Sequence, residues 1–364
     1  MAEAALSRDV PLPAECSPLV DRVEAELARF LAAQRGELGR RDPDVLNLFG
    51  ELDRVIASGG KRLRPLFCCL GHMAAGAEVD DRAVRAAAAL ELLHTFAILH
   101  DDVMDRSPAR RGVAATWVHL AEHHRREGLR GEPEAYGVAG AVLLGDLALV
   151  LAGRALREAG FPPDALIPAL ERYDRMRAEV VAGQYLDVLA AHRGEADEDR
   201  ARRIAVLKSG GYTVEGPLHI GALLGGGSRE LLDALSRYGV PLGEAFQLRD
   251  DVLGVFGDPA VTGKDRDSDL REGKRTLLVA KAAAAAGPED RTFLETRLGR
   301  PDLTADEVER GRAILESTGA LDETLAVIEE LVARAKSALD RTLMHSQGAV
   351  PLEQMADLVA VRHL

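Results

Sequence analysis

The chain has 364 residues, with 46 basic against 59 acidic side chains, a formal charge of −13, and 47% hydrophobic but only 4% aromatic residues. The acidic balance argues against a general nucleic-acid binder, because such proteins present a basic surface. No stretch reaches the roughly 18 uninterrupted apolar residues of a membrane span, since Asp146 breaks the nearest candidate at 138–153. No basic region followed by an apolar one opens the chain, so we expect no signal peptide and a cytoplasmic protein.

Apolar residues recur at helical spacing along most of the chain. Residues 1–17 lack this period and are predicted to be a flexible tail. The helical patterns cover 19–30, 44–57, 65–75, 80–105, 134–158, 163–191, 198–225, 228–256, 274–286, 303–318, 320–344 and 351–360. Strand-like alternation is nearly absent, and alanine-rich segments such as 85–92 favour helix intrinsically. The sequence therefore predicts a single all-α domain over 18–364.

The first acidic motif ends an apolar helical pattern. Asp101, Asp102 and Asp105 follow the apolar run 92–99. On a helix, Asp101 and Asp105 are i,i+4 neighbours, and His94 lies two turns earlier on the same face. Carboxylates at this spacing repel one another unless a cation lies between them, and Mg²⁺ prefers one or two carboxylates with phosphate oxygens. The motif predicts a magnesium site, with a solvated acidic helix end as the alternative.

A second acidic pair, Asp250 and Asp251, ends another apolar helical pattern. The i+4 partner of Asp250 is Gly254, so this pair is expected to hold a cation less firmly than the first motif. The two motifs lie far apart in sequence, yet each ends an apolar helix. We expect them to face each other across a cavity and to share several Mg²⁺ ions.

Basic residues near glycines supply the complementary charge. The sequence GKRLRP at 60–65 precedes a predicted helix, whose free amides join Lys61 and Arg64 in an anion site. The further basic candidates are Arg110, Arg111, Lys208 beside Ser209, and Lys264 and Lys274 in a glycine- and aspartate-rich segment over 257–276. That segment is expected to be a mobile loop. Each basic cluster alone also fits a solvated surface; together they predict diphosphate sites around magnesium.

These segments resemble the ordered motifs of the trans-isoprenyl diphosphate synthases. The motifs are GKRLRP at 60–65, DDVMD at 101–105, FQLRDD at 246–251, and the GDP, GK and DLREGKRT elements within 257–276. The resemblance implies an all-α bundle around a deep central cavity, usually as a homodimer. It also implies that an allylic diphosphate (dimethylallyl, geranyl or farnesyl) ionises and that isopentenyl diphosphate adds to it head to tail.

The resemblance also implies roles for individual residues. Asp101 and Asp105 would bind two Mg²⁺ with support from Asp102, and Asp250 a third; Gly254, where many members have Asp, leaves a ligand role for Asp251 open. The residues that would hold the allylic diphosphate are Arg110, Lys208, Lys264 and Lys274. Those that would hold isopentenyl diphosphate are Lys61, Arg64, His94 and Arg111. Ser209 and Gln247 would lie beside the nascent cation.

Phe96 is the candidate for setting product length. It lies five residues before Asp101, about 7.5 Å along a helix axis, but the helical angle does not fix its direction. By resemblance, one aromatic at this position next to the small Ala97 is typical of geranylgeranyl diphosphate synthases, with farnesyl diphosphate synthase as the alternative. Simple packing of Phe96 against a neighbouring helix remains open.

Three other functions use part of the same motifs. A class I terpene cyclase usually begins its second metal motif with Asn, whereas the one asparagine here is Asn47. An HD-type metal phosphohydrolase would use His100 and Asp101, but it would leave the second aspartate pair without a role. A non-catalytic partner subunit typically lacks an aspartate motif. Phosphate release without elongation would favour the hydrolase, and no activity alone would favour the partner subunit.

Overall fold

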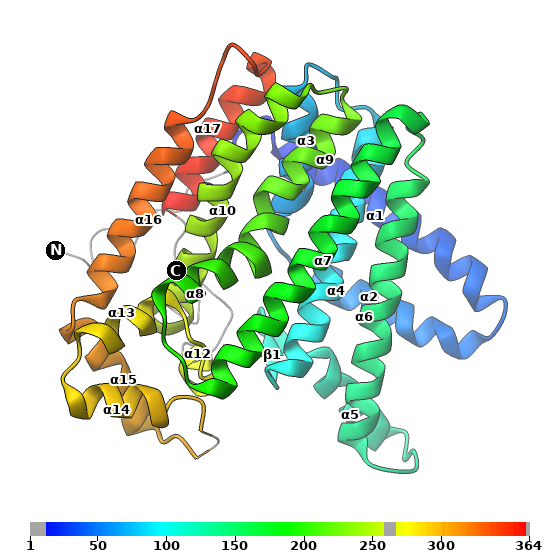
Figure 1. Ribbon diagram of the computed structural model, residues 1–364. Helices are drawn as coiled ribbons and strands as arrows, with labels where there is room; N and C mark the ends of the chain where they lie inside the picture. Colours follow the sequence, from blue (N-terminus) through cyan, green and yellow to red (C-terminus); the bar gives the residue numbers. More distant parts are fainter. Residues whose placement is uncertain (1–11, 258–266, 301, 362–364) are drawn as a thin grey trace.

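The structure is a computed structural model that describes residues 12–257, 267–300 and 302–361, and these residues are predominantly helical (Figure 1). The α-helices are α1 (Ser17–Gly39), α2 (Leu46–Ala57), α3 (Leu63–Ala74), α4 (Asp81–Met104), α5 (Thr116–Arg126), α6 (Pro133–Arg157), α7 (Pro163–Arg193), α8 (Glu198–Ala205), α9 (Gly216–Leu224), α10 (Arg229–Phe256), α12 (Ser268–Glu272), α13 (Leu277–Ala285), α14 (Pro288–Thr296), α15 (Ala305–Ser317), α16 (Ala320–Ser337) and α17 (Ser346–Val361). A 3₁₀ turn, η2, covers Pro43–Val45. The all-α prediction is confirmed.

One short hairpin departs from helix. Strands β1 (Ala109–Arg110) and β2 (Val113–Ala114) pair antiparallel, with Ala109 opposite Ala114. The turn between them places Arg111 at φ 53° and Gly112 at φ 74°. Such left-handed backbone is uncommon for a residue with a side chain. The hairpin therefore directs the two adjacent arginines, Arg110 and Arg111, to different partners.

The predicted helix over 198–225 is three elements. Between α8 and α9, Val206–Glu215 forms a π-helix, η3. A π-helix is rare, and where one occurs it frequently lies at a functional site. The segment 257–276 also differs from the predicted loop, because 268–272 form α12. Helices α5 and α14 were not predicted, since both are short and mostly polar.

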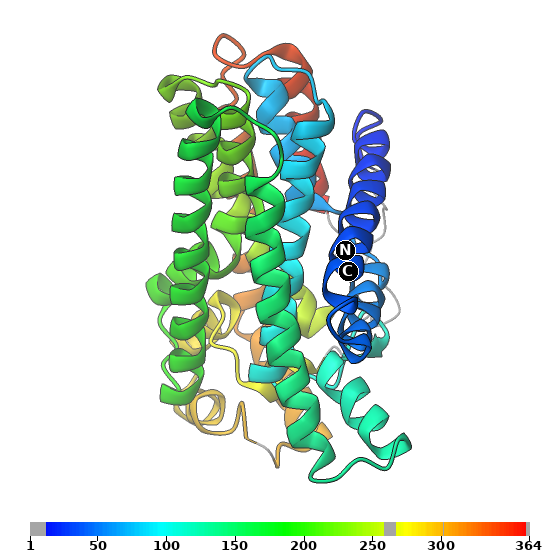
Figure 2. The same cartoon turned by 90° about the vertical axis from the view of Figure 1, so that its right-hand side faces the viewer.

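Helix α4 lies at the centre of the bundle. Its first turn is capped by Asp80, whose side chain accepts hydrogen bonds from the amides of Arg82 and Ala83. Buried residues lie around its whole circumference, as expected for a helix enclosed by others. It packs against α1, α3, α6 and α9 (Figures 1 and 2). Its carboxyl end carries the first aspartate motif to the same end of the bundle as α12 and β1.

Glycines let η3 pack closely against its neighbours. A Cβ at Gly243 of α10 would lie 2.4 Å from the carbonyl oxygen of Gly210, and one at Gly183 of α7 would lie 2.4 Å from the Lys208 amide nitrogen. Neither position accepts a larger residue without backbone movement. These contacts fix η3 between α7 and α10, so Lys208 and Ser209 lie where the two helices meet.

The core extends beyond the predicted domain start. Cys16, within the predicted tail, is fully buried, whereas residues 1–11 lie outside the described part of the chain. A second apolar cluster, which includes Val255, Leu270 and Leu278, packs α12 to α16 beside the main core. This cluster anchors α12 against the end of α10.

Helices α4 and α6 are each long and apolar enough to cross a membrane by length and composition alone. In the most apolar 18-residue stretch of α4, 67% is the share that is buried inside the protein, as expected for a core helix. The corresponding share for α6 is 39%, so part of its apolar surface faces outward. Two such helices are weak evidence for a membrane span.

Candidate active site

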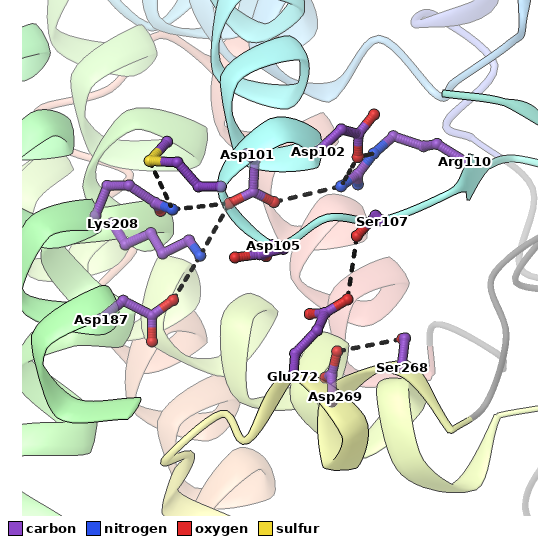
Figure 3. A network of polar contacts seen from close by, with 12 residues as sticks. Asp101, Asp102, Asp105, Ser107, Arg110, Asp187, Lys208, Ser268, Asp269 and Glu272 are labelled. Atoms are coloured by element: carbon purple, nitrogen blue, oxygen red, sulfur yellow. Dashed lines mark hydrogen bonds and ion pairs between the residues drawn. The ribbon is translucent and has the colours of Figure 1, made fainter. Parts of the chain in front are cut away.

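Asp101 lies at the centre of a polar network formed by α4, α7, η3 and β1 (Figure 3). Gln184 Nε2 donates a hydrogen bond to its Oδ1 (3.0 Å), and Lys208 Nζ lies 3.2 Å from the same atom. The Arg110 guanidinium lies 3.3 Å from Asp101 Oδ2 and 2.6 Å from Asp102 Oδ1. Lys208 also pairs with Asp187 Oδ2 of α7 at 2.6 Å.

The charges of this network reinforce one another. Burial alone would raise the pKa of Asp101, but Lys208, Lys274 and Arg110 outweigh it and hold that pKa well below its usual range. Burial likewise opposes the charge of Lys208, yet Asp101 and Asp187 raise its pKa. Both groups therefore stay ionised at neutral pH. A buried, ionised lysine next to carboxylates is a donor suited to phosphate oxygens.

Asp105 has a different environment from Asp101. Burial and the neighbouring charge of Asp101 raise its pKa to about 7. Lys274 Nζ lies 3.3 Å from Asp105 Oδ2, 3.4 Å from Asp269 Oδ1 and 2.7 Å from Glu272 Oε2. Lys274 therefore links the first aspartate motif to α12.

The second aspartate pair meets the same lysines. Asp250, Asp251 and Gln247 of α10 line one small cavity together with Lys208 and Lys274. Gln247 Nε2 donates to Asp251 Oδ1 at 2.7 Å, while burial and the charge of Asp269 raise the pKa of Asp251 to about 8. Lys208 and Lys274, which pair with Asp101 and Asp105 of the first motif, therefore link that motif to the cavity of the second.

The structure explains how the chain accommodates Gly254. A Cβ at Gly254 would lie 1.9 Å from Asp269 Oδ2, so the carboxylate of Asp269 fills the space beside that glycine. Asp269 is buried and lines the same cavity as Asp251. From the sequence, Gly254 in place of an acidic residue predicted weaker cation binding by the second pair. In the folded chain the carboxylate of Asp269 lies beside this glycine.

The carboxylates fit a hydrated cation better than a closed metal cage. Among the described residues, no three His, Cys, Asp or Glu side chains converge as a ready-made metal site. Asp105 Oδ2 is buried and accepts no hydrogen bond from the described residues, although Lys274 lies near it. Mg²⁺ usually takes only one or two carboxylates and completes its octahedron with water and substrate phosphate. The oxygen donors present suit that ion.

A second, mainly cationic group surrounds His94. Arg64 Nη2 donates to Thr213 Oγ1 at 2.8 Å, and its guanidinium lies 4.2 Å from the centroid of the Tyr212 ring. Tyr212 Oη is 3.4 Å from His94 Nδ1. Burial, followed by Arg64 and Arg111, lowers the pKa of His94 well below its usual value, so the ring is neutral. The geometry brings three of the four predicted isopentenyl diphosphate residues together.

Three predicted diphosphate-site and cation-site residues remain to be placed: Lys61, Ser209 and Lys264. Lys61 is exposed and directly precedes the residue that caps α3. Ser209 is buried in η3 next to the contact with α10. Lys264 lies outside the described residues.

The side chains of His100 and Asp101 diverge, which counts against the HD-type hydrolase. His100 Nε2 lies 3.0 Å from the Val142 carbonyl oxygen of α6, while Asp101 faces η3. The Phe96 ring packs edge-on against His100, with centroids 4.9 Å apart. Phe96 is therefore directed toward α6, a direction that the sequence left open.

Sequence reasoning missed four polar residues of the network: Gln184, Asp187, Asp269 and Glu272. Gln184 and Asp187 are spaced i,i+3 on α7, which puts both on one helix face. That spacing was the available signal, but polar residues on a long amphipathic helix usually face solvent. Asp269 and Glu272 fell within a quoted motif without an assigned role.

Comparison with known proteins agrees with this geometry. The polyprenyl synthetase family profile matches residues 47–315. A geranylfarnesyl diphosphate synthase of Aeropyrum pernix is 35% identical over 82% of this chain and 88% of its own, and a geranylgeranyl diphosphate synthase of Mycobacterium tuberculosis is 32% identical over 94% and 90%. The crystal structure of a Corynebacterium glutamicum geranylgeranyl pyrophosphate synthase, complexed with isoprenyl diphosphate and magnesium, superposes with a TM-score of 0.91 at 34% identity, covering 95% of this chain and 99% of that one. The resemblance inferred from the motifs is confirmed: the chain belongs to the polyprenyl synthetase family and is a trans-prenyltransferase.

Proposed function

We propose that the protein condenses isopentenyl diphosphate head to tail with allylic diphosphates and that geranylgeranyl diphosphate (C20) is its main product. The observation that carries the proposal is the division of the site into two halves that meet at Arg110. One half combines carboxylates with Lys208 and Lys274, and the other combines Arg64, His94 and Arg111. A reaction of two diphosphates, of which one ionises, needs both.

The acidic half suits the allylic diphosphate. The family depends on divalent metal, and we assign Mg²⁺, in three ions, to Asp101, Asp105 and Asp250 with Asp102 and Asp251 beside them. Bound Mg²⁺ would supply positive charge that stabilises the departing diphosphate. Lys208, Lys274 and Arg110, which pair with aspartates in the structure, donate to the same diphosphate when it binds. Gln247 gives its N–H to Asp251, so its carbonyl oxygen is the group left to face the cation.

Replacing Lys61 by Ala is expected to raise the KM for isopentenyl diphosphate about tenfold, the typical effect of losing one charged hydrogen bond. The KM for the allylic substrate should stay within about twofold, because Lys61 lies outside the acidic half. Steady-state kinetics with each substrate varied in turn measures both constants. Lys336→Ala, on the remote helix α16, is the control. A larger change in the allylic KM than in the isopentenyl KM would reverse our assignment of the two halves.

Phe96 is expected to limit product length. Its ring is 9% exposed and directed toward α6, on the helix that leads away from Asp101. Phe96→Ala should shift the products beyond C20, and Ala97→Phe should shorten them to C15. Chromatography of the dephosphorylated products measures both shifts. Phe293→Ala removes a ring that is 7% exposed in the second apolar cluster and should leave product length unchanged. Unchanged products from both α4 variants would reduce Phe96 to a packing residue.

We propose that the protein is a homodimer whose interface is the outward apolar face of α6. Tyr136, Leu143 and Val150 recur every seven residues and therefore form one stripe, in which Leu143 is 60% and Val150 63% exposed. The paired substitution Leu143→Glu and Val150→Glu should convert the dimer to a monomer in size-exclusion chromatography with light scattering. Val350→Glu, on α17, should not. A dimer that survives the paired substitution would place the interface elsewhere.

Pyrophosphate release tests the reaction class. We expect release only when isopentenyl diphosphate, an allylic diphosphate and a divalent cation are all present. Farnesyl diphosphate synthesis is the alternative that keeps the same chemistry. A terpene cyclase would release pyrophosphate from the allylic substrate alone, and a hydrolase would release phosphate without any isoprenoid product.

A further inference from the structure

Arg62 lies inside the basic segment 60–65, yet its side chain is directed into the protein. It is 5% exposed, and its Nη1 lies 2.8 Å from Glu91 Oε1 of α4. Nη2 donates to the Ile56 carbonyl at 2.8 Å, Nη1 to the Gly59 carbonyl at 3.3 Å, and Nε to Glu24 at 3.2 Å. These contacts use four of the five N–H donors of a guanidinium.

The backbone of Arg62 is held in an unfavourable conformation. The residue has φ 49° and ψ 38°, in the left-handed region, and it caps the start of α3. A residue with a side chain persists there only when its surroundings hold it. Arg111 Nη1 also donates to the carbonyl oxygen of Gly59, so two arginines fix that peptide. The turn of Gly59 and Gly60 thus has one defined geometry.

Glu91 connects this turn to the helix of the first aspartate motif. It is 4% exposed and lies three residues before His94, on the same face of α4. The Arg62–Glu91 ion pair is therefore buried at both ends and bridges the basic segment to α4. It joins the segment that carries Lys61 and Arg64 to the helix that carries His94.

We propose that Arg62 and Glu91 are a positioning pair for the isopentenyl diphosphate site, and that Arg62 does not itself contact substrate. The proposal rests on the proposed function and adds two residues to it. A charged fork held by buried contacts fixes a loop more rigidly than a flexible ammonium does. The pair thus presents Lys61, Arg64 and His94 to one diphosphate in a preset arrangement.

The test is a double-mutant cycle with Arg62→Gln, Glu91→Gln and the double variant, measured as KM for each substrate. Each single change is expected to raise the KM for isopentenyl diphosphate about tenfold, the lower end of losses seen when a supporting residue is removed. The allylic KM should change less than about twofold, and the double variant should be no worse than either single one. Glu24→Gln, which changes the exposed ion-pair partner of Arg62 and leaves the buried Arg62–Glu91 pair intact, is the control with unchanged constants.

Two outcomes would overturn the proposal. If Arg62 bound diphosphate directly, Glu91→Gln would release its guanidinium and leave the isopentenyl KM unchanged or lower, and Arg62→Lys would keep most of the affinity. If the pair served stability alone, the thermal midpoint would fall with both KM values changing alike. If Arg62→Gln does not fold, the same KM measurements on Arg62→Lys and Glu91→Gln test the proposal. A wild-type enzyme without condensation activity would instead refute the proposed function.

Discussion

Replacing Asp101 by Asn is expected to lower kcat by about 10³-fold, the scale on which removal of one preorganised electrostatic contact acts. The substitution keeps the shape of the side chain but removes the charge that pairs with Lys208 and Arg110. Helix content should not change, because Asp101 lies at the polar end of α4 and outside its apolar core. Circular dichroism and steady-state turnover at saturating substrate measure the two effects. The wild-type thermal midpoint should also rise with Mg²⁺, and that of the variant should rise much less.

Asp146→Asn is the matched control, because it changes another aspartate near the same end of the bundle. Asp146 is on α6, 3.7 Å from His100 Nε2, and belongs to neither acidic motif. It should retain wild-type turnover. Undiminished activity of Asp101→Asn, or full wild-type activity in excess chelator, would contradict the metal-dependent mechanism.

Lys208→Met is expected to lower kcat by about 10²-fold or more, since it removes a buried cation from the departing diphosphate. The methionine keeps much of the side-chain volume, so packing between α7 and α10 should survive. In the structure Lys208 neutralises Asp101 and Asp187, and loss of its charge also leaves those carboxylates without a partner. We therefore expect the variant to be less stable without Mg²⁺ and to recover part of that stability when Mg²⁺ is added.

Lys281→Met tests whether any buried lysine between two carboxylates has this effect. Lys281 pairs with Glu198 at 3.2 Å and Glu323 at 3.0 Å and is about as buried as Lys208. It lies on α13, away from the aspartate motifs. Its loss should cost stability but not turnover. Equal turnover of Lys208→Met and Lys281→Met would show that Lys208 takes no part in the reaction.

The fold class and most of the site could be predicted because their signals are local. Helical periodicity and alanine content predicted the all-α architecture, and aspartates at the end of an apolar helix pointed to the place of the candidate site. The burial of α4 along its length is visible in the sequence as an apolar run that leads up to Asp101. These features need no knowledge of which helices become neighbours.

The rest depends on contacts between distant segments. Asp269 fills the space beside Gly254, and Glu91 pairs with Arg62, only after the helices pack. The sequence predicted 198–225 as one helical pattern and did not predict the π-helix at 206–215, which packs closely against the distant helices α7 and α10. The direction of Phe96 was open for the same reason, since it depends on where α6 lies.

The proposed reaction joins isopentenyl diphosphate to an allylic diphosphate and stops near C20. The most direct measurement incubates the purified protein and Mg²⁺ with isopentenyl diphosphate and, separately, dimethylallyl, geranyl or farnesyl diphosphate, and then resolves the dephosphorylated products by chain length. We expect linear products dominated by geranylgeraniol, with one pyrophosphate released for each unit added. Phosphate release without elongation, a cyclic hydrocarbon, or no product from any starter would contradict it.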